Sequence, residues 1–289
     1  MKERKARNQF PRTDNIPVQS TKYWAKEKDR YIRQLLISDI EQETEREMVV
    51  YFSRLDQVIT ETDADDLSEI LQGVESKEVD ILLHTPGGLV DAVEKFISVL
   101  RLLEIRYRVI IPSLAKSGGT LISLSGEQIL MGVNSELGPI DPQMNTPDFG
   151  PISAEYVASD TNQPQIWQEI AKANVARGKN LAEKALRAIF SPKTATPAQA
   201  EIDASNAAVT SVLDKICSPT GYGSHGAVID YAEANLLKLP VIWMPPESTL
   251  WKRVWLLYCL YDFDTKQDDL GKIFEGALYS ISRPPLEWQ

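Results

Sequence analysis

Ser117 is a residue whose type and surroundings are suited to chemistry. It lies in "SLAKSGGTLISLSGEQ", between a lysine and two glycines at the start of an apolar run. A serine in this position can cap a helix, because its side-chain oxygen accepts hydrogen bonds from the N–H groups of the first turn. It can also be a nucleophile, since the positive end of the helix dipole would favour an alkoxide-like transition state there. The stretch therefore indicates either a helix cap or an acyl-transfer site.

A second glycine-rich turn, Pro86-Gly87-Gly88, favours the acyl-transfer interpretation. Glycines let the backbone approach a bound carbonyl closely and aim N–H groups at it, as in an oxyanion hole. Both turns follow expected strands, and ligands collect at the carboxyl ends of strands in parallel α/β sheets. Helix capping alone would not require the second turn, so we interpret Ser117 as a nucleophile.

The elements that must position these turns alternate between strands and helices. Strands are expected at 47–53, 79–85, 107–114 and 128–132, and helices at 63–74, 89–103 and 117–125. Alternating elements of this length point to crossover units and a mostly parallel sheet in an α/β fold. Beyond Asp141 a Pro/Gly-bearing connection at 146–153 precedes helical patterns from 165 to 217. A further strand is expected near Leu239, followed by an aromatic helix at 251–261.

Composition and charge describe an ordinary globular chain of 289 residues, 43% of them hydrophobic. The net charge of −10 argues against non-specific nucleic-acid binding, which depends on a basic surface. Residues 1–33 nevertheless carry ten Lys/Arg and four Asp/Glu, which predicts a basic, flexible N-terminal arm.

Two cysteines, Cys217 and Cys259, lack the close spacing of a zinc site or a disulfide framework. The charged N-terminus lacks the apolar stretch of a signal peptide, and the longest apolar run is about half of the roughly 20 residues needed to span a bilayer. We therefore expect a cytoplasmic protein without a transmembrane segment, a metal or another cofactor.

Two quoted stretches carry a resemblance to a known family. "LLHTPGGLVDAVEKF" and "AKSGGTLISLSGEQILMGVNSELGPIDPQ" resemble the paired motifs of the Clp protease and crotonase-like superfamily. More narrowly, they resemble the serine dehydrogenase proteinase family, relatives of signal peptide peptidase A. The resemblance covers residues 48–143 closely and extends loosely to "SHGAVIDYAEANLLKLPV" from Ser224. The two motifs in this order, about thirty residues apart, are a much more specific signal than either alone.

The resemblance implies a spiral of β-β-α units with a helical C-terminal elaboration. It implies one domain over 34–289, with a catalytic α/β core at 34–145 and a helical elaboration and closing α/β unit at 146–289. It also implies a homo-oligomer, as a trimer, hexamer or larger ring, that acts on a peptide or protein. Ser117 would be the nucleophile, the N–H groups of Gly88 and Gly118 the oxyanion donors, and Gly87 would shape the approach.

The general base departs from the family pattern. Where the Clp protease pattern has a histidine, this sequence has Asp141, which can orient a base supplied from elsewhere. The chain has only two histidines, and His225 is the preferred base over His84. A Ser-Lys pair, as in the signal peptide peptidase relatives, would use Lys172 or Lys179 of the expected helix, with Lys172 the nearer fit.

Three other functions stay open at this point. An acyl-CoA-binding enzyme of crotonase type would use the same two N–H donors without a serine nucleophile. A catalytically inactive scaffold would keep the fold for assembly and would need no base. An α/β-hydrolase is disfavoured because the G-x-S-x-G motif is missing from the sequence. The leading prediction is a serine peptidase that forms an acyl-enzyme on Ser117.

Overall fold

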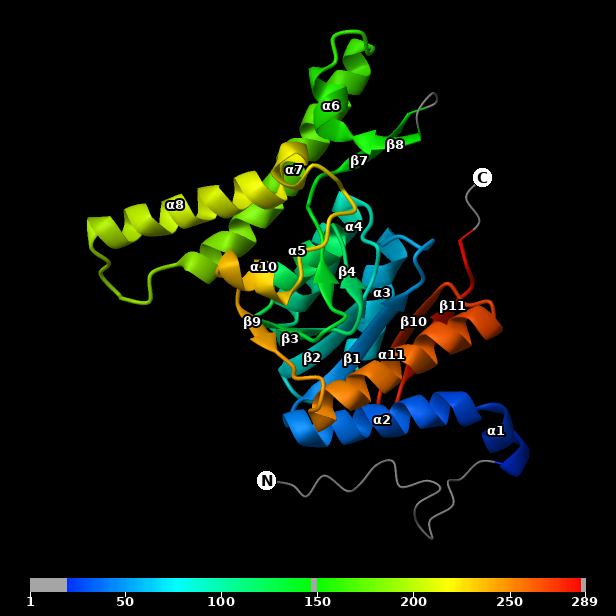
Figure 1. Ribbon diagram of the computed structural model, residues 1–289. Helices are drawn as coiled ribbons and strands as arrows, with labels where there is room; N and C mark the ends of the chain where they lie inside the picture. Colours follow the sequence, from blue (N-terminus) through cyan, green and yellow to red (C-terminus); the bar gives the residue numbers. More distant parts are fainter. Residues whose placement is uncertain (1–19, 147–149, 287–289) are drawn as a thin grey trace.

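A seven-stranded sheet in the order β11-β10-β1-β2-β3-β5-β9 forms the centre of the computed structural model, which describes residues 20–146 and 150–286 (Figure 1). Its strands are β1 (Glu47–Ser53), β2 (Glu78–His84), β3 (Arg106–Ile111), β5 (Gln128–Met131), β9 (Val241–Trp243), β10 (Lys272–Gly276) and β11 (Ser280–Arg283). The five strands from β1 to β9 pair in parallel, which confirms the predicted crossover units. The hairpin of β10 and β11, which was not predicted, adds to β1 in antiparallel fashion.

Helices cover both faces of the sheet (Figure 1). They are α1 (Thr21–Lys26), α2 (Lys28–Thr44), α3 (Glu61–Leu71), α4 (Val90–Leu102), α5 (Gly118–Leu124), α6 (Ala154–Ser159), α7 (Gln165–Phe190), α8 (Gln199–Ile216), α9 (Pro219–Tyr222), α10 (Tyr231–Leu236) and α11 (Thr249–Gln267). All residues of β1 are buried, because successive side chains point to opposite faces and both faces are covered. Val49 and Tyr51 join the core with α3 and α4, whereas Val50 and Phe52 join the core with α2 and α11.

The predicted N-terminal arm, residues 1–33, extends too far along the sequence, because its last residues belong to a helix. Helix α2 runs through residue 33, and its Ile37 and Ile40 are fully buried beneath the sheet. Arg33 is buried as well, and its Nε donates to Glu275 Oε2 of β10 at 2.8 Å. Its basic charge is therefore neutralised inside the fold and does not mark a flexible segment. The part of the arm from 1 to 19 lies outside the described residues.

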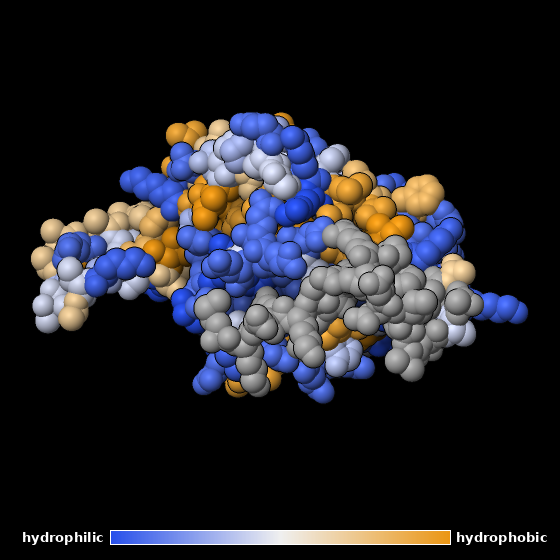
Figure 2. Space-filling view, turned by 90° about the horizontal axis from the view of Figure 1, so that it is seen from below, coloured by the Kyte–Doolittle hydropathy of each residue, from blue (hydrophilic) through white to orange (hydrophobic). Residues whose placement is uncertain are grey.

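The aromatic helix α11 lies beside α2 on the lower face of the sheet (Figure 1). Trp251 is buried in the core, and Trp255 stacks on it with ring centroids 6.0 Å apart. Trp251 thus belongs to the core, and the partly buried Trp255 and Tyr258 pack against that core. The outer side of α11 exposes Leu256 and Phe263, and Figure 2 shows this side of the molecule as a mainly hydrophilic surface with separate hydrophobic patches.

Two small sheets lie outside the central one. Strands β4 (Leu114–Ala115) and β6 (Glu136–Leu137) pair in parallel, and β7 (Gln143–Thr146) pairs with β8 (Gly150–Ser153) in antiparallel fashion. Isolated bridges join Thr85 to Ala115 and Leu137 to Ile229. Helices α7 and α8 confirm the helical pattern predicted between 165 and 217, and they extend away from the central sheet (Figure 1).

Candidate active site

Ser117 joins β4 to α5 in a backbone conformation that is rare for a residue with a side chain. Its φ is 49° and its ψ is −109°. Its carbonyl accepts from Leu121 N at 3.1 Å and so begins the helix, but its side chain makes no capping hydrogen bond. The helix-cap interpretation is therefore wrong. Strained conformations of this kind persist where the surrounding structure holds them, and they cluster at functional sites.

The Pro86-Gly87-Gly88 turn lies directly against Ser117. Lys116 N donates to Thr85 O at 3.0 Å, which joins the two loops just before each turn. Gly87 has a φ of +100°, and a Cβ atom on it would lie 2.8 Å from Ser117 Cβ. On the other side of the turn, Ile59 N donates to Gly87 O at 2.8 Å, and a Cβ atom on Gly88 would clash with the Ile59 backbone. Glycine is thus required at both positions.

Two backbone N–H groups beside Ser117 are free to bind an anion. Within the described part of the chain, the N–H groups of Gly88 and Gly118 have no hydrogen-bond acceptor. The two glycines are close, since Gly88 N lies 3.3 Å from the position that a Cβ atom on Gly118 would take. Both line the same pocket as Ser117. Paired N–H donors of this kind can stabilise a negatively charged oxygen.

His225 lines this pocket and contacts Asp141. Nδ1 of His225 lies 2.5 Å from Oδ1 of Asp141, although the two residues are 84 positions apart. The Asp141 side chain is only 5% exposed, whereas that of His225 is 37% exposed. Gln143 Nε2 donates to the second carboxylate oxygen of Asp141 at 2.8 Å. A histidine held through Nδ1 leaves Nε2 for proton transfer.

The pocket has a volume of about 630 Å³ and combines apolar walls with these polar groups. Ser117 and His225 both line it without a direct hydrogen bond between them in the described structure. Catalytic hydrogen bonds are often loose before substrate binds. The walls are mostly apolar: Val58, Pro86, Leu89, Val90, Val93, Leu121, Ile140 and Pro142.

The other predicted bases lie outside this pocket. His84 is buried, its Nδ1 lies 2.9 Å from Ser53 O, and its ring stacks on Phe52. Burial lowers the pKa of His84 to about 4, so its imidazole is neutral at ordinary pH. Lys172 is more than half exposed on α7 and pairs with Glu169 at 2.9 Å. Lys179, farther along the same helix, lies 3.7 Å from a carboxylate oxygen of Glu155.

Three residues of the site were missed in the sequence. Gln143 supports Asp141, and Asn174 and Gly178 of α7 line the pocket. Gly178 carried a signal, because it is the only glycine in the long helical pattern from 165 to 190. A Cβ atom there would lie 3.1 Å from Pro142 Cγ, so the glycine lets the helix approach the segment that carries Asp141.

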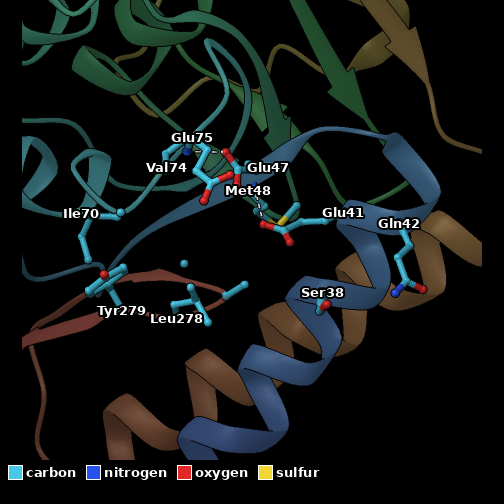
Figure 3. A pocket seen from close by; sticks show the side chains of 13 residues that line it. Ser38, Glu41, Gln42, Glu47, Met48, Ile70, Val74, Glu75, Leu278 and Tyr279 are labelled. Atoms are coloured by element: carbon cyan, nitrogen blue, oxygen red, sulfur yellow. Dashed lines mark hydrogen bonds between the residues drawn. The ribbon is translucent and has the colours of Figure 1, made fainter. Parts of the chain in front are cut away.

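A separate pocket, of only about 80 Å³, lies between α2, the start of β1 and the β10–β11 hairpin (Figure 3). Two of its three carboxylates, those of Glu41 and Glu47, accept hydrogen bonds from backbone N–H groups. Glu41 accepts from Met48 N at 2.9 Å, and Glu47 accepts from the N–H groups of Glu75 and Ser76. These contacts connect separate segments of the chain, so the two carboxylates have a structural role.

Over residues 20–146 and 150–286, His, Cys, Asp and Glu side chains do not gather in groups of three or more that could bind a metal ion. Among the helices of the same ranges, none has the length and apolarity needed to cross a bilayer.

Two proteins of Methanocaldococcus jannaschii are similar to the chain. The uncharacterized protein MJ0137 is 35% identical over 131 residues, which cover 43% of this chain and 46% of MJ0137. The uncharacterized protein MJ1495 is 40% identical over 84 residues, which cover 28% of this chain and 29% of MJ1495. The matches thus span less than half the length of each relative.

Two solved structures are also similar at low sequence identity. A mutant of the 1510-N membrane-bound stomatin-specific protease matches with a TM-score of 0.42 and 18% identity, over 66% of this chain and 76% of that chain. A mutant of ClpP1 from Listeria monocytogenes matches with a TM-score of 0.42 and 14% identity, over 71% of this chain and 96% of that chain.

A family model decides the relationship. The model of the ClpP-like SDH-type serine proteinases matches residues 30–189, more than half of the chain. The match includes both glycine-rich turns and Asp141, and it confirms the predicted relationship to the serine dehydrogenase proteinases and the predicted Clp protease-like fold. The chain belongs to the ClpP-like SDH-type serine proteinase family.

Proposed function

We propose that the protein is a serine peptidase in which Ser117 is the nucleophile, His225 the general base and Asp141 the residue that orients the base. One observation carries the proposal. His225, which contacts Asp141 at 2.5 Å, lines the same pocket as Ser117 and the two glycines with free N–H groups. Membership of a serine proteinase family supports the reaction class.

The first half of the reaction forms an acyl-enzyme. Ser117 Oγ attacks the carbonyl carbon of the scissile peptide bond while His225 Nε2 takes the hydroxyl proton. The N–H groups of Gly88 and Gly118 donate to the oxyanion of the tetrahedral intermediate. The C–N bond then breaks, and His225 returns the proton to the leaving amine.

The second half restores the enzyme. Water attacks the acyl carbon, His225 takes a proton from this water, and the intermediate collapses to a carboxylic acid. Ser117 Oγ leaves and recovers its proton from His225. The Asp141 side chain stabilises the imidazolium of His225 in both halves, with its second oxygen held by Gln143.

The pocket is suited to a peptide or protein substrate. Its largely apolar walls can bury side chains next to the scissile bond, and the backbone of Leu89 and Val90 adjoins the Gly88 donor. A crotonase-type enzyme would use the two N–H donors but would have no role for a paired His225 and Asp141. The pair therefore favours the peptidase.

The experiment that tests the proposal is labelling of the purified protein with a fluorophosphonate probe, followed by mass spectrometry of the modified peptide. We expect modification at Ser117 that is lost in Ser117→Ala. Ser125→Ala is the matched control, because Ser125 ends the same helix and donates to Leu121 O at 2.9 Å outside the pocket. The absence of labelling between pH 6 and 9 in folded protein would refute the activated nucleophile and favour the scaffold or the acyl-CoA enzyme.

Three wider expectations belong to the same proposal. They are a cytoplasmic location, assembly into a ring of identical subunits, and a division into a core at 34–145 and an elaboration at 146–289. The projecting α7 and α8 support the division, and exposed apolar side chains on α7, such as Ile166 and Ile170, support assembly. Light scattering after size-exclusion chromatography measures the oligomeric state.

A further inference from the structure

Lys116, the residue before Ser117, extends its side chain to the loop that carries His225. Its Nζ donates to Ala227 O at 2.9 Å and to Gly226 O at 3.4 Å, and lies 3.2 Å from Glu136 Oε2. The side chain is only 14% exposed. An ammonium group has three donors, and here they meet two carbonyls and one carboxylate.

The path of this side chain is built into the small β4–β6 sheet. Ala115 of β4 is paired with Leu137 of β6, and Leu137 is bridged on its other side to Ile229. Strand β6 therefore lies between the strand that leads to Ser117 and the segment that follows His225. The Lys116 side chain passes Gly138, the residue after this middle strand, where a Cβ atom would lie 2.5 Å from Lys116 Cδ.

The loop that Lys116 reaches contains no helix or strand from residue 223 to residue 228. Two of its hydrogen bonds are local, since Gly226 N donates to Ser224 Oγ and Ala227 N donates to Ser224 O, each at 3.2 Å. Local bonds of this kind shape the loop but do not fix its distance from Ser117. The bonds from Lys116 connect it to the turn that carries the nucleophile.

We propose that Lys116 is a positioning residue, which fixes the His225 loop relative to Ser117 by binding the two carbonyls that follow the histidine. This inference rests on the proposed roles of Ser117 and His225. Its consequence is kinetic, because misplacement of a catalytic group by about 1 Å can cost about a hundredfold in rate. Lys116 acts through His225 and does not take part in proton transfer.

The test compares Lys116→Met, which keeps the aliphatic stem, with Lys116→Arg, which keeps charged donors. The first readout is the second-order rate constant for fluorophosphonate labelling of Ser117. We expect a decrease of about tenfold or more in Lys116→Met and recovery of most of the rate in Lys116→Arg. Lys266→Met is the matched control, because Lys266 is exposed and pairs with Asp262 at 2.7 Å on α11.

The second readout is NMR of the protein with ¹⁵N-labelled histidine. The chain has two histidines, so two ring systems report separately on the site and on the core. In Lys116→Met we expect the ring signals of His225 to shift. Those of His84 should stay unchanged, because its ring is buried and bound to Ser53 O at 2.9 Å. Lys116→Arg should return the His225 signals toward those of the wild type.

Each outcome decides the inference. Labelling of Lys116→Met within about twofold of the wild-type rate would overturn it, as would unchanged His225 ring signals. If the ring signals of both histidines shift because Lys116→Met is misfolded, Gly138→Ala is used as the test variant instead. The added Cβ displaces the Lys116 stem, and unaltered labelling or unaltered His225 signals in that variant would overturn the inference. If the wild type is not labelled, the proposed function fails, while the ring signals still decide the role of Lys116.

Discussion

The buried histidine His84 makes the stability of the fold depend on pH. Its pKa is lowered from 6.5 to about 4, chiefly because burial disfavours the charged ring. Between these two values the unfolded chain binds a proton that the folded protein does not bind. The free energy of unfolding should therefore fall as the pH decreases below about 6.5 and stop responding to this group below about 4.

The size of the effect follows from the two pKa values. Their difference corresponds to about 3 kcal/mol when the group is fully titrated, and about 2 kcal/mol of this should be lost between pH 8 and pH 5. Urea denaturation at constant protein concentration over this range measures the loss. His225→Gln is the suitable background, because His84 is then the only histidine in the chain.

The matched comparison is the double variant with His84→Gln, whose amide can still donate to Ser53 O. Carboxyl groups titrate alike in both proteins, so the difference between their pH profiles isolates His84. We expect the protein that retains His84 to lose about 2 kcal/mol more on acidification to pH 5. Equal losses within about 0.5 kcal/mol would refute the assignment of His84 as a neutral core residue.

Two further predictions concern the packing of α2 against the sheet and the proposed active site. Replacing Arg33 by Met should lower the free energy of unfolding by about 3–5 kcal/mol, because it leaves the buried Glu275 carboxylate without its guanidinium partner. Urea denaturation measures this, and a loss below about 1 kcal/mol would contradict the integration of α2 into the fold. Asp141→Asn should slow fluorophosphonate labelling of Ser117 by about 10²- to 10⁴-fold, because the amide cannot stabilise the imidazolium of His225. The urea midpoint is the control for folding, and labelling at the wild-type rate would remove Asp141 from the mechanism.

The local sequence was sufficient to predict the strands β1, β2, β3 and β5, the helices α3 to α5 and the two glycine-rich turns. These features follow from interactions between residues close in the chain. The spacing of apolar residues distinguishes a strand from a helix. The positive φ of Gly87 is required by the conformation of a single turn. Ser117 could be named for the same reason, because its neighbours in sequence form its immediate environment.

Local sequence patterns could not predict contacts between residues that are far apart in the chain. Arg33 was assigned to a flexible arm, because its partner Glu275 lies 242 positions away in the sequence. The hairpin of β10 and β11 likewise gains its place from pairing with β1, far away in the chain. A short, buried strand of this kind has too few residues to carry a clear period of its own.

The proposed general base, His225, illustrates the same difference between local and tertiary information. From the sequence, His225 was one of several candidate bases. The type of a residue indicates whether its side chain can accept a proton, but not which groups lie beside it in the fold. Only the tertiary structure places it 2.5 Å from Asp141, and leaves His84 in the core and Lys172 on the surface. The sequence by itself thus determined the turn that carries Ser117 and the glycines beside it, because their geometry is local. The partner of Asp141 was decided by the fold, because closing an 84-residue separation depends on the packing of everything between.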